Sequence, residues 1–293
     1  MGILSKTDVI KRIMIGEMLI NPDQREVISQ NLQNSATLEN FFKEYFEKLA
    51  LKPEILGKRR LAIKNYVEKK FLEKTPSEIR NVLMQDLNDF IKDEDKILFP
   101  IFIDDVKPEC LRTANYDLRL GADVYVSTEK VPGKLNVMGK NGTISIEPGE
   151  FGILMSHEYI FVPPDLMGFI SIRLTHKQKG LVNISGFHVD PGFYGRLVFA
   201  VFNAGPNDVP LRYKEPVFMI MFEKLIHPIR IGKSRWHGME DIPVETLSGL
   251  RGTSVSVRSL DERIKRLEIT FPLIITGVIG VMVAVITWVL THW

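Results

Sequence analysis

The chain has 293 residues, which is enough for one well-packed core and a smaller attached module. Its formal net charge of +2 gives no bulk electrostatic case for nucleic acid, so we expect no direct nucleic-acid binding. The single cysteine, Cys110, excludes both an internal disulfide framework and a zinc site built on Cys-x-x-Cys, and it fits a reducing compartment.

Residues 1–22 predict a helix near the start of the chain. Ser5 and Asp8 have the spacing of a capping box, and apolar residues from Val9 to Met14 follow at helical spacing. The capping box therefore predicts that this helix begins directly after Ser5.

Residues 23–100 predict further helices. Ser35 or Thr37 can cap the first, Pro53 fits the first turn of the second, and Thr75–Glu78 is a strong start for the third. Three amphipathic helices can make a small lobe. We leave two roles open for it: a packed decoration, or a docking or sensing module.

From Leu98 to about His227 the pattern changes to strands separated by Pro-Gly, Asn-Gly and Gly-Pro turns. This pattern is typical of a β-barrel or a double-sheet jelly roll. The fold class is thus mainly β with α. The expected strands are Ala122–Val126, Ile144–Ile146, Gly152–Met155, Glu158–Val162, Met167–Ile172, Leu197–Phe202 and Val217–Glu223.

Residues 228–256 predict a mobile connection to the C-terminal part of the chain. Leu260, Ile264, Leu267 and Phe271 then repeat at spacings of four and three, which indicates a short coiled coil in a linker over 241–269.

Residues 270–291 predict a single transmembrane helix. The run Phe271–Leu290 carries no charge and is long enough to cross roughly 30 Å of hydrocarbon. Trp288 and Trp293 suit an interfacial position, and Gly280 with Ala284 offers a face for close helix packing. The alternative is a buried C-terminal helix of a soluble domain.

The charges around this span predict its orientation. Four basic residues precede it and only His292 follows, so the positive-inside rule leaves the N-terminal domain in the cytoplasm. The basic residues are Arg258, Arg263, Lys265 and Arg266.

The segment Gly186–Asn203 is the most informative stretch of the chain. Asp190 stands at the mouth of a Pro-Gly turn, and an alternating apolar run from Leu197 leads to Asn203 and Gly205. This segment resembles the core motif of the dCTP deaminase and dUTPase superfamily. Three more segments resemble the family's motifs in the same order: Asn115–Gly121, Pro148–Leu154 and Ile160–Leu166.

This resemblance implies a dUTPase-like distorted β-barrel or jelly roll formed by residues 1–22 and 101–240, with 23–100 inserted. It implies a homotrimer that binds a nucleotide at its subunit interfaces. It also implies that the first helix ends in a short strand over 16–22, where Gly-x-x-Leu-Ile-x-Pro is similar to the family's N-terminal segment.

The resemblance also identifies a missing group. In the deaminases a glutamate stands ten residues after the motif's aspartate, and here that residue is Ala200. The family's metal-free reaction needs a carboxylate to move protons, which alanine cannot do. Glu150 and Glu158 are the candidates for a relocated acid. The zinc route of other deaminases is excluded by the single cysteine.

Arg173–Leu181 corresponds to the family's phosphate-binding motif. Arg173 is retained and Thr175 keeps one hydroxyl, whereas Leu174 and Gln178 replace a serine and the second arginine. Such a site needs hydroxyl donors and a guanidinium fork, so phosphate binding is weakened or altered. The alternative is a basic turn on the rim of the barrel.

The remaining site residues are also implied by the resemblance. Asn183 to His188 would line the base pocket, and Phe193 could stack on the deoxyribose. Asp190 would touch the sugar hydroxyl or orient water, as in dUTPases whose Mg²⁺ is held largely by the phosphates; the alternative is an aspartate that caps its own turn. Arg235, Trp236 and His237 look like the segment that folds over the nucleotide.

Two main functions remain open. The first is a membrane-anchored nucleotide-binding protein without deaminase activity, which acts as a nucleotide-sensing effector, for example in antiviral defence. The alternative is dUTPase-like hydrolysis of a deoxynucleoside triphosphate, a role in nucleotide metabolism, or deamination by a relocated acid. A third reading is a scaffold whose pocket has decayed.

Overall fold

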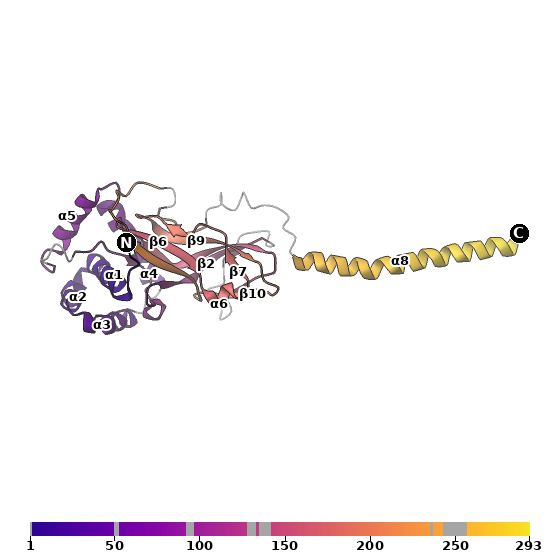
Figure 1. Cartoon of the computed structure of the whole chain (residues 1–293), viewed down its shortest axis with the longest axis horizontal. Coiled ribbons are helices and arrows are strands. Elements are labelled where there is room, and N and C mark those ends of the chain that lie inside the picture. Colours follow the sequence, from indigo (N-terminus) through magenta and orange to yellow (C-terminus); the bar gives the residue numbers. More distant parts are fainter. Residues whose placement is uncertain are drawn as a thin grey trace.

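The computed structural model describes residues 2–49, 53–91, 97–127, 133–134, 142–234, 237–242 and 257–293. Helices gather at one end of a strongly curled antiparallel sheet, and a long C-terminal helix extends away from the opposite end (Figure 1). Mixed α and β content around a dominant sheet confirms the fold class expected from the sequence.

The N-terminal region is helical. The capping boxes at Ser5 and Thr75 are present, and the helix that begins at Pro53 is confirmed. Asn34, not Ser35 or Thr37, caps the helix that follows it. The helices are α1 (Lys6–Ile20), α2 (Arg25–Leu32), α3 (Ser35–Lys48), α4 (Pro53–Lys70) and α5 (Pro76–Leu87), and α2 was not predicted.

The strand expected over 16–22 is wrong. Helix α1 continues to Ile20 and a 3₁₀ turn, Pro22–Gln24, follows it. Met18 and Leu19 are buried on the inner face of this last turn, so helical geometry places both side chains in the core.

The sheet follows the order β7-β9-β5-β2-β11-β6-β8, with β1 on β5 and β3 on β2, and every pairing is antiparallel. Strands β4 and β10 pair separately. The two strands expected at 152–155 and 158–162 form one strand, β5, with a register shift between Met155 and Tyr159. The strands are β1 (Phe102–Ile103), β2 (Tyr116–Val126), β3 (Gly133–Lys134), β4 (Thr143–Ile146), β5 (Phe151–Phe161), β6 (Leu166–Ile172), β7 (Leu181–Asn183), β8 (His188–Val189), β9 (Tyr194–Asn203), β10 (Val209–Arg212) and β11 (Pro216–Lys224).

The loop 184–187 brings the two ends of this sheet together. The amides of Ile184 and Ser185 donate to the carbonyl of Ala200 on β9, at 2.9 and 3.3 Å. On the other side, the amide of Ile170 on β6 donates to the carbonyl of Phe187 at 2.8 Å. Because β7 and β8 are the end strands, these bonds curl the sheet toward a closed barrel.

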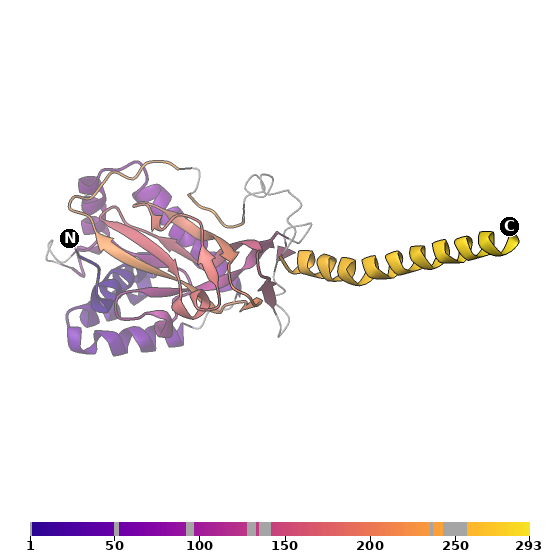
Figure 2. The same cartoon turned by 45° about the vertical axis from the view of Figure 1, so that its right-hand side comes forward.

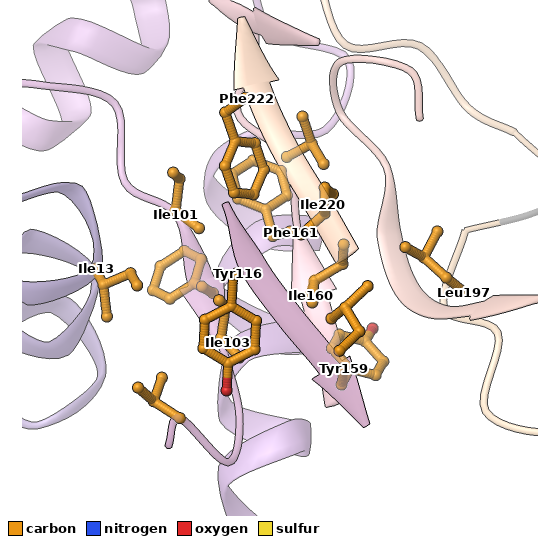
Figure 3. Packing of buried hydrophobic residues seen from close by; sticks show 14 of the residues in the cluster. Ile13, Ile101, Ile103, Tyr116, Tyr159, Ile160, Phe161, Leu197, Ile220 and Phe222 are labelled. Carbon is orange, nitrogen blue, oxygen red and sulfur yellow. The ribbon is translucent and has the colours of Figure 1, made fainter. Parts of the chain in front are cut away.

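The helices and the sheet share one hydrophobic core. Phe71, at the end of α4, and Phe102 of β1 pack on Phe161 of β5 with ring centroids 5.5 and 5.8 Å apart. From the other side, Ile13 of α1 points toward the same layer (Figure 3). The insertion is thus packed directly on the barrel.

Two basic residues of α4 also attach the insertion to the barrel. The Arg59 guanidinium pairs with Glu17 of α1, and its Nε donates to the carbonyl of Asp104 at 2.7 Å. Arg60 pairs with the Asp104 carboxylate and donates to the carbonyl of His157 at 2.7 Å. These two charged groups of α4 therefore face the protein interior.

The described residues after β11 fall into a packed part and a long helix. Ile231 is buried, and Met239 forms an isolated parallel bridge with Gly195, so residues 228–234 and 237–242 lie on the barrel. Helix α8 (Val257–His292) is continuous and extends alone (Figure 2). It is apolar and long enough to cross a membrane over Arg263–His292. Residues 243–256 of the expected mobile connection lie outside the described residues.

Candidate functional site

Asp190 lies on an exposed turn at the end of β8. Its side chain is 79% exposed, and its Oδ1 lies 3.5 Å from His188 Nε2. The turn is closed by backbone bonds: the Phe193 amide donates to the Asp190 carbonyl at 3.1 Å, and the Gly192 amide donates to the Val162 carbonyl at 2.7 Å. Gly192 has a φ of 87°, which favours glycine. Within the described residues no turn amide donates to the Asp190 carboxylate, so the carboxylate is available to a ligand.

Phe193 and His188 lie on either side of Asp190 in the sequence and differ in burial. Phe193 is half-buried and packs against the main core, whereas His188 is exposed beside Asp190. His188 and Asp190 therefore form one polar pair on the surface.

The predicted phosphate-binding residues lie on a second turn, directly after β6. Arg173 Nε lies 3.3 Å from Asp117 Oδ2, and its Nη1 donates to the carbonyl of Pro216 at 3.3 Å. Thr175 and Gln178 are exposed on and just after the short helix α6 (Leu174–Lys177). The guanidinium of Arg173 is thus oriented by an acid of β2, with its side chain 29% exposed.

The two turns are far apart within one chain. Strand register pairs Gly168 with Val189, so Asp190 lies near Met167 at the start of β6, whereas Arg173 follows the end of that strand. Six residues of extended chain span about 20 Å. The structure therefore brings Asp190 together with His188, and Arg173 together with Thr175 and Gln178, but it does not join the two groups.

Asn183 and Ala200 lie together at the loop 184–187. Asn183 pairs in register with Val201, and its Oδ1 accepts from the amide and hydroxyl of Ser185 at 3.2 and 2.6 Å. The next two amides bind the carbonyl of Ala200. The residue at the family's glutamate position is thus beside the expected base-binding loop.

The side chain of Ala200 belongs to the outer face of the sheet. Ala200 pairs with Ile153, and the neighbouring pairs on this face are Val198 with Met155 and Phe202 with Phe151. Tyr125 and Ile153 form a small apolar cluster here, against which Phe151, Val198 and Ile242 pack. The face therefore offers a purely apolar setting where a glutamate was expected by resemblance.

Neither candidate for a relocated acid shares this face. Glu158 is fully buried and holds Arg119, with its Oε1 2.6 Å from Arg119 Nε. Glu150 is also buried, and its Oε2 accepts from the amide of Glu147 at 2.7 Å. Glu150 lies next to Asn203, whose side chain faces the interior, so it points to the opposite face from Ala200.

His237 lies beside Tyr194 at the start of β9, with ring centroids 4.8 Å apart. Burial lowers the pKa of His237, so the neutral ring is favoured. The Gly238 amide donates to the Tyr194 carbonyl at 2.8 Å. This holds the segment against β9. Arg235 and Trp236, which were predicted to act with His237, lie outside the described residues.

Sequence reasoning missed three supporting residues. Asp117 orients Arg173, Asn203 binds the Gly205 amide through its Oδ1 at 2.9 Å, and Ile242 covers the apolar face near Ala200. Asp117 and Asn203 stand inside the quoted motifs, so their presence there was a usable signal. Ile242 carries no local signal, because its contacts are made only after folding.

Comparisons with known proteins agree with this architecture. A family model described as dCTP deaminase-like matches residues 88–225. A dCTP deaminase of Pyrococcus abyssi is 35% identical over 135 residues, which cover 46% of this chain and 84% of that protein. This chain belongs to the dCTP deaminase-like family. A dCTP deaminase of Pyrococcus furiosus is 36% identical to this chain, and the match covers 83% of that protein.

Solved structures similar to this dCTP deaminase-like chain overlap it only in part. The dCTP deaminase of Agrobacterium tumefaciens is 16% identical, with a TM-score of 0.35 over 41% of this chain and 42% of that one. The EIAV dUTPase is 19% identical, with a TM-score of 0.27; the match covers 32% of this chain and 77% of that one. Helices α1 to α5 and α8 lie outside the range matched by the family model.

Proposed function

We propose that this chain is a membrane-anchored, nucleotide-binding member of the dCTP deaminase-like family that does not deaminate its ligand. The observation that carries the proposal is Ala200, which pairs with Ile153 on an apolar sheet face beside the loop 184–187. Deamination needs a carboxylate that moves protons between water and the base. Neither Glu150 nor Glu158 can supply it from the interior, because both are buried away from this face.

The ligand-binding surface is proposed to use both turns. Arg173, Thr175 and Gln178 offer a cation and polar donors for phosphates, and Asn183, His188, Asp190 and Phe193 would contact the nucleoside together with Arg235, Trp236 and His237. Because Arg173 and Asp190 stand about 20 Å apart in one chain, a complete pocket would combine the two turns of neighbouring copies. This separation supports a homotrimer.

Contacts between the insertion and the Asp190 turn support a sensing role. A Cβ atom on Gly192 would lie only 2.7 Å from Ile231, so the turn and Ile231 are in close contact. The Ile231 carbonyl accepts from the amide of Glu73, just after α4, at 2.9 Å. Nearby, the Tyr194 hydroxyl donates to Glu68 of α4 at 3.0 Å. A ligand that moves the turn would thus change the packing of the insertion, as a population shift.

One observation favours hydrolysis as a second candidate. The Asp190 carboxylate is exposed, and its described partner is the His188 ring. A dUTPase-like site requires one such carboxylate from the protein, because the phosphates provide most of the ligands of the Mg²⁺ ion. Asp190 fits that requirement. The ion would supply charge neutralisation on the phosphates. Asp190 would orient a water molecule and accept its proton.

The experiment uses the full chain in detergent micelles with dCTP, dUTP and other nucleotides in the presence of Mg²⁺. Thermal shift reports binding and chromatography reports products. The variant is Asp190→Ala, and the matched control is Asp23→Ala, which removes an exposed acid from the 3₁₀ turn after α1. We expect a nucleotide to raise the Tm of the chain without being converted to product. Asp190→Ala should reduce this rise in Tm, whereas Asp23→Ala should not. Pyrophosphate release that depends on Asp190 would favour the hydrolase, and uracil nucleotide formed from dCTP would overturn the proposal.

A further inference from the structure

Helix α8 carries a continuous apolar stripe from its first turn to its last. Apolar residues recur at alternating spacings of three and four along the whole helix, a mean period of 3.5. Every position of this stripe is apolar over five heptads. In heptad notation these are the a and d positions. They are Val257, Leu260, Ile264, Leu267, Phe271, Ile274, Val278, Val281, Val285 and Trp288.

The first part of this stripe cannot be explained by a membrane. Leu260, Ile264 and Leu267 are 47%, 52% and 63% exposed, and they lie among charged residues that precede the uncharged run. Such charges cost several kcal/mol each inside hydrocarbon, so this part of the helix lies in water or headgroups. The other apolar residue there, Ile269, is two residues from the span. An exposed apolar stripe with a 3.5-residue period is the seam of a coiled coil and needs a helical partner.

The charges beside the stripe match a second copy of the same helix. Arg263 directly precedes Ile264 and is a g position, while Glu268 directly follows Leu267 and is an e position. In a parallel, in-register pair, a g residue faces the e residue five positions later on the other helix. Arg263 of one copy therefore meets Glu268 of the other, a complementary pair. In an antiparallel pair, g positions face g positions and e positions face e positions, so the contact between Arg263 and Glu268 would be lost.

A shared membrane orientation also favours a parallel arrangement of the α8 helices. All copies of one chain enter the bilayer from the same side, so their α8 helices are parallel. Through the span all faces of the helix are largely apolar, so only the a and d register continues, and Gly277 and Ala284 occupy consecutive g positions beside it. Small residues next to a seam allow helices to approach closely in lipid.

We propose that α8 forms a parallel, in-register coiled coil with α8 of other copies of this chain, through one seam that begins in water and continues across the membrane. The described part of α8 makes no contact with the barrel that would cover this seam, because Leu260, Ile264 and Leu267 stay exposed in the single chain. The seam joins copies of the chain independently of any nucleotide.

The first test maps the contacting face by disulfide formation. The full chain, in lipid vesicles and with Cys110→Ser, carries one new cysteine at a time. Leu260→Cys and Leu267→Cys probe the seam, and Lys265→Cys and Arg266→Cys probe the opposite side of the same turns. Mild oxidation is expected to give covalent dimers at the seam positions only. Equal yields from both sides, or none from the seam in a chain that has inserted, would overturn the proposal.

The second test addresses the charge pair. In the Leu260→Cys chain, Arg263→Glu or Glu268→Arg alone places like charges across the seam, and each is expected to weaken association about three- to tenfold. The combined exchange restores the opposite pairing and should restore the dimer yield. Arg266→Glu, which lies away from the seam, is the control and should have little effect. If the combined variant stays as weak as either single one, the parallel in-register arrangement is wrong.

Discussion

Ala200 is the residue on which the proposed loss of deamination rests. Its side chain is half-buried among Val198, Ile153 and Phe202, and it lies beside the loop whose amides bind its own carbonyl. A glutamate at this position would bring a partly desolvated carboxylate to the expected base-binding loop. Partial desolvation raises a carboxyl pKa and makes the group a better proton carrier near neutral pH.

We therefore predict that Ala200→Glu introduces deaminase activity. Uracil nucleotide formed from dCTP should rise at least about 10²-fold above the background of the unmodified chain, the lower range for a positioned acid–base group. The products are separated by chromatography. Ala200→Gln has the same shape without the titratable group and should give no activity. Equal rates from Gln and Glu would mean that position 200 does not carry protons.

His157 provides a second test at the residue scale. The pKa of His157 is lowered, and burial is the largest cause. The hydrogen bond to Asp105 Oδ2 at 3.0 Å opposes this shift without cancelling it. The unfolded chain, with an ordinary histidine pKa of about 6.5, therefore binds a proton more readily than the folded chain. Stability from this group is present above that pH and is lost as the pH falls.

The expected result is a lower Tm at about pH 5.5 than at pH 7 for the full chain in detergent. His157→Gln should reduce this slope while keeping a donor for Asp105. Some slope should remain, because burial also lowers the pKa of His176 and His237. An unchanged slope in the variant would show that His157 does not titrate in this range.

At the scale of elements, helix α4 is held on the barrel by buried charges. Arg59 pairs with Glu17 of α1 and donates to the Asp104 carbonyl, and both paired side chains are almost fully buried. Replacing one member of such a pair leaves the other charge buried without a partner. This pair therefore contributes to the docking of α4.

Arg59→Met should destabilise the full chain by about 3–5 kcal/mol, the usual cost of one unpaired buried charge. Adding Glu17→Met should recover most of this loss, because the double variant removes both charges. Lys58→Met changes the exposed neighbour on the same helix and should be nearly neutral. The measurement is chemical unfolding followed by circular dichroism. A double variant as unstable as Arg59→Met would show that packing, not charge, limits the docking of α4.

The elements that could be predicted from the sequence are those specified by local contacts. The capping boxes at Ser5 and Thr75 involve residues three positions apart, and both helices begin where expected. Strand β5 was split in prediction at Ser156 and His157, two polar residues between the two expected strands. In the structure His157 and Glu158 are satisfied by Asp105 and Arg119, which are distant in sequence. A polar run paired by remote residues cannot be distinguished from a turn without the fold.

For the candidate site, the sequence could indicate the local backbone setting of the motif residues, whereas their roles stay predictions. Arg173 and Asp190 lie at turns and Asn183 ends strand β7, since each motif encodes its own local geometry. The contact of the Asp190 turn with Ile231 could not be read from the sequence, because residues 228–256 looked mobile. A lone isoleucine in a polar segment carries no signal until its packing partner is known.

At the scale of the whole molecule, the described part of the chain combines a barrel with one helix that is long and apolar enough to span a membrane. The window of highest hydropathy in α8 averages 2.6, and none of its residues is buried in the single chain. A soluble protein would cover such a helix with other parts of its fold. Its exposure and the basic residues that precede it support the membrane anchor proposed above.

The anchor can be tested by placing charge at the centre of the span. Val278→Lys with Val281→Lys should cost about 5–7 kcal/mol of insertion free energy, because each central lysine costs about 2.5–3.5 kcal/mol. The full chain should then move from the carbonate-resistant membrane fraction to the soluble or aggregated fraction. Ile269→Lys with Thr270→Lys adds the same charge at the edge, where long side chains reach water, and should leave the chain in the membrane with its barrel protected from external protease. Release of the unmodified chain by carbonate would mean that α8 is covered by protein, and that its uncharged run serves assembly in water.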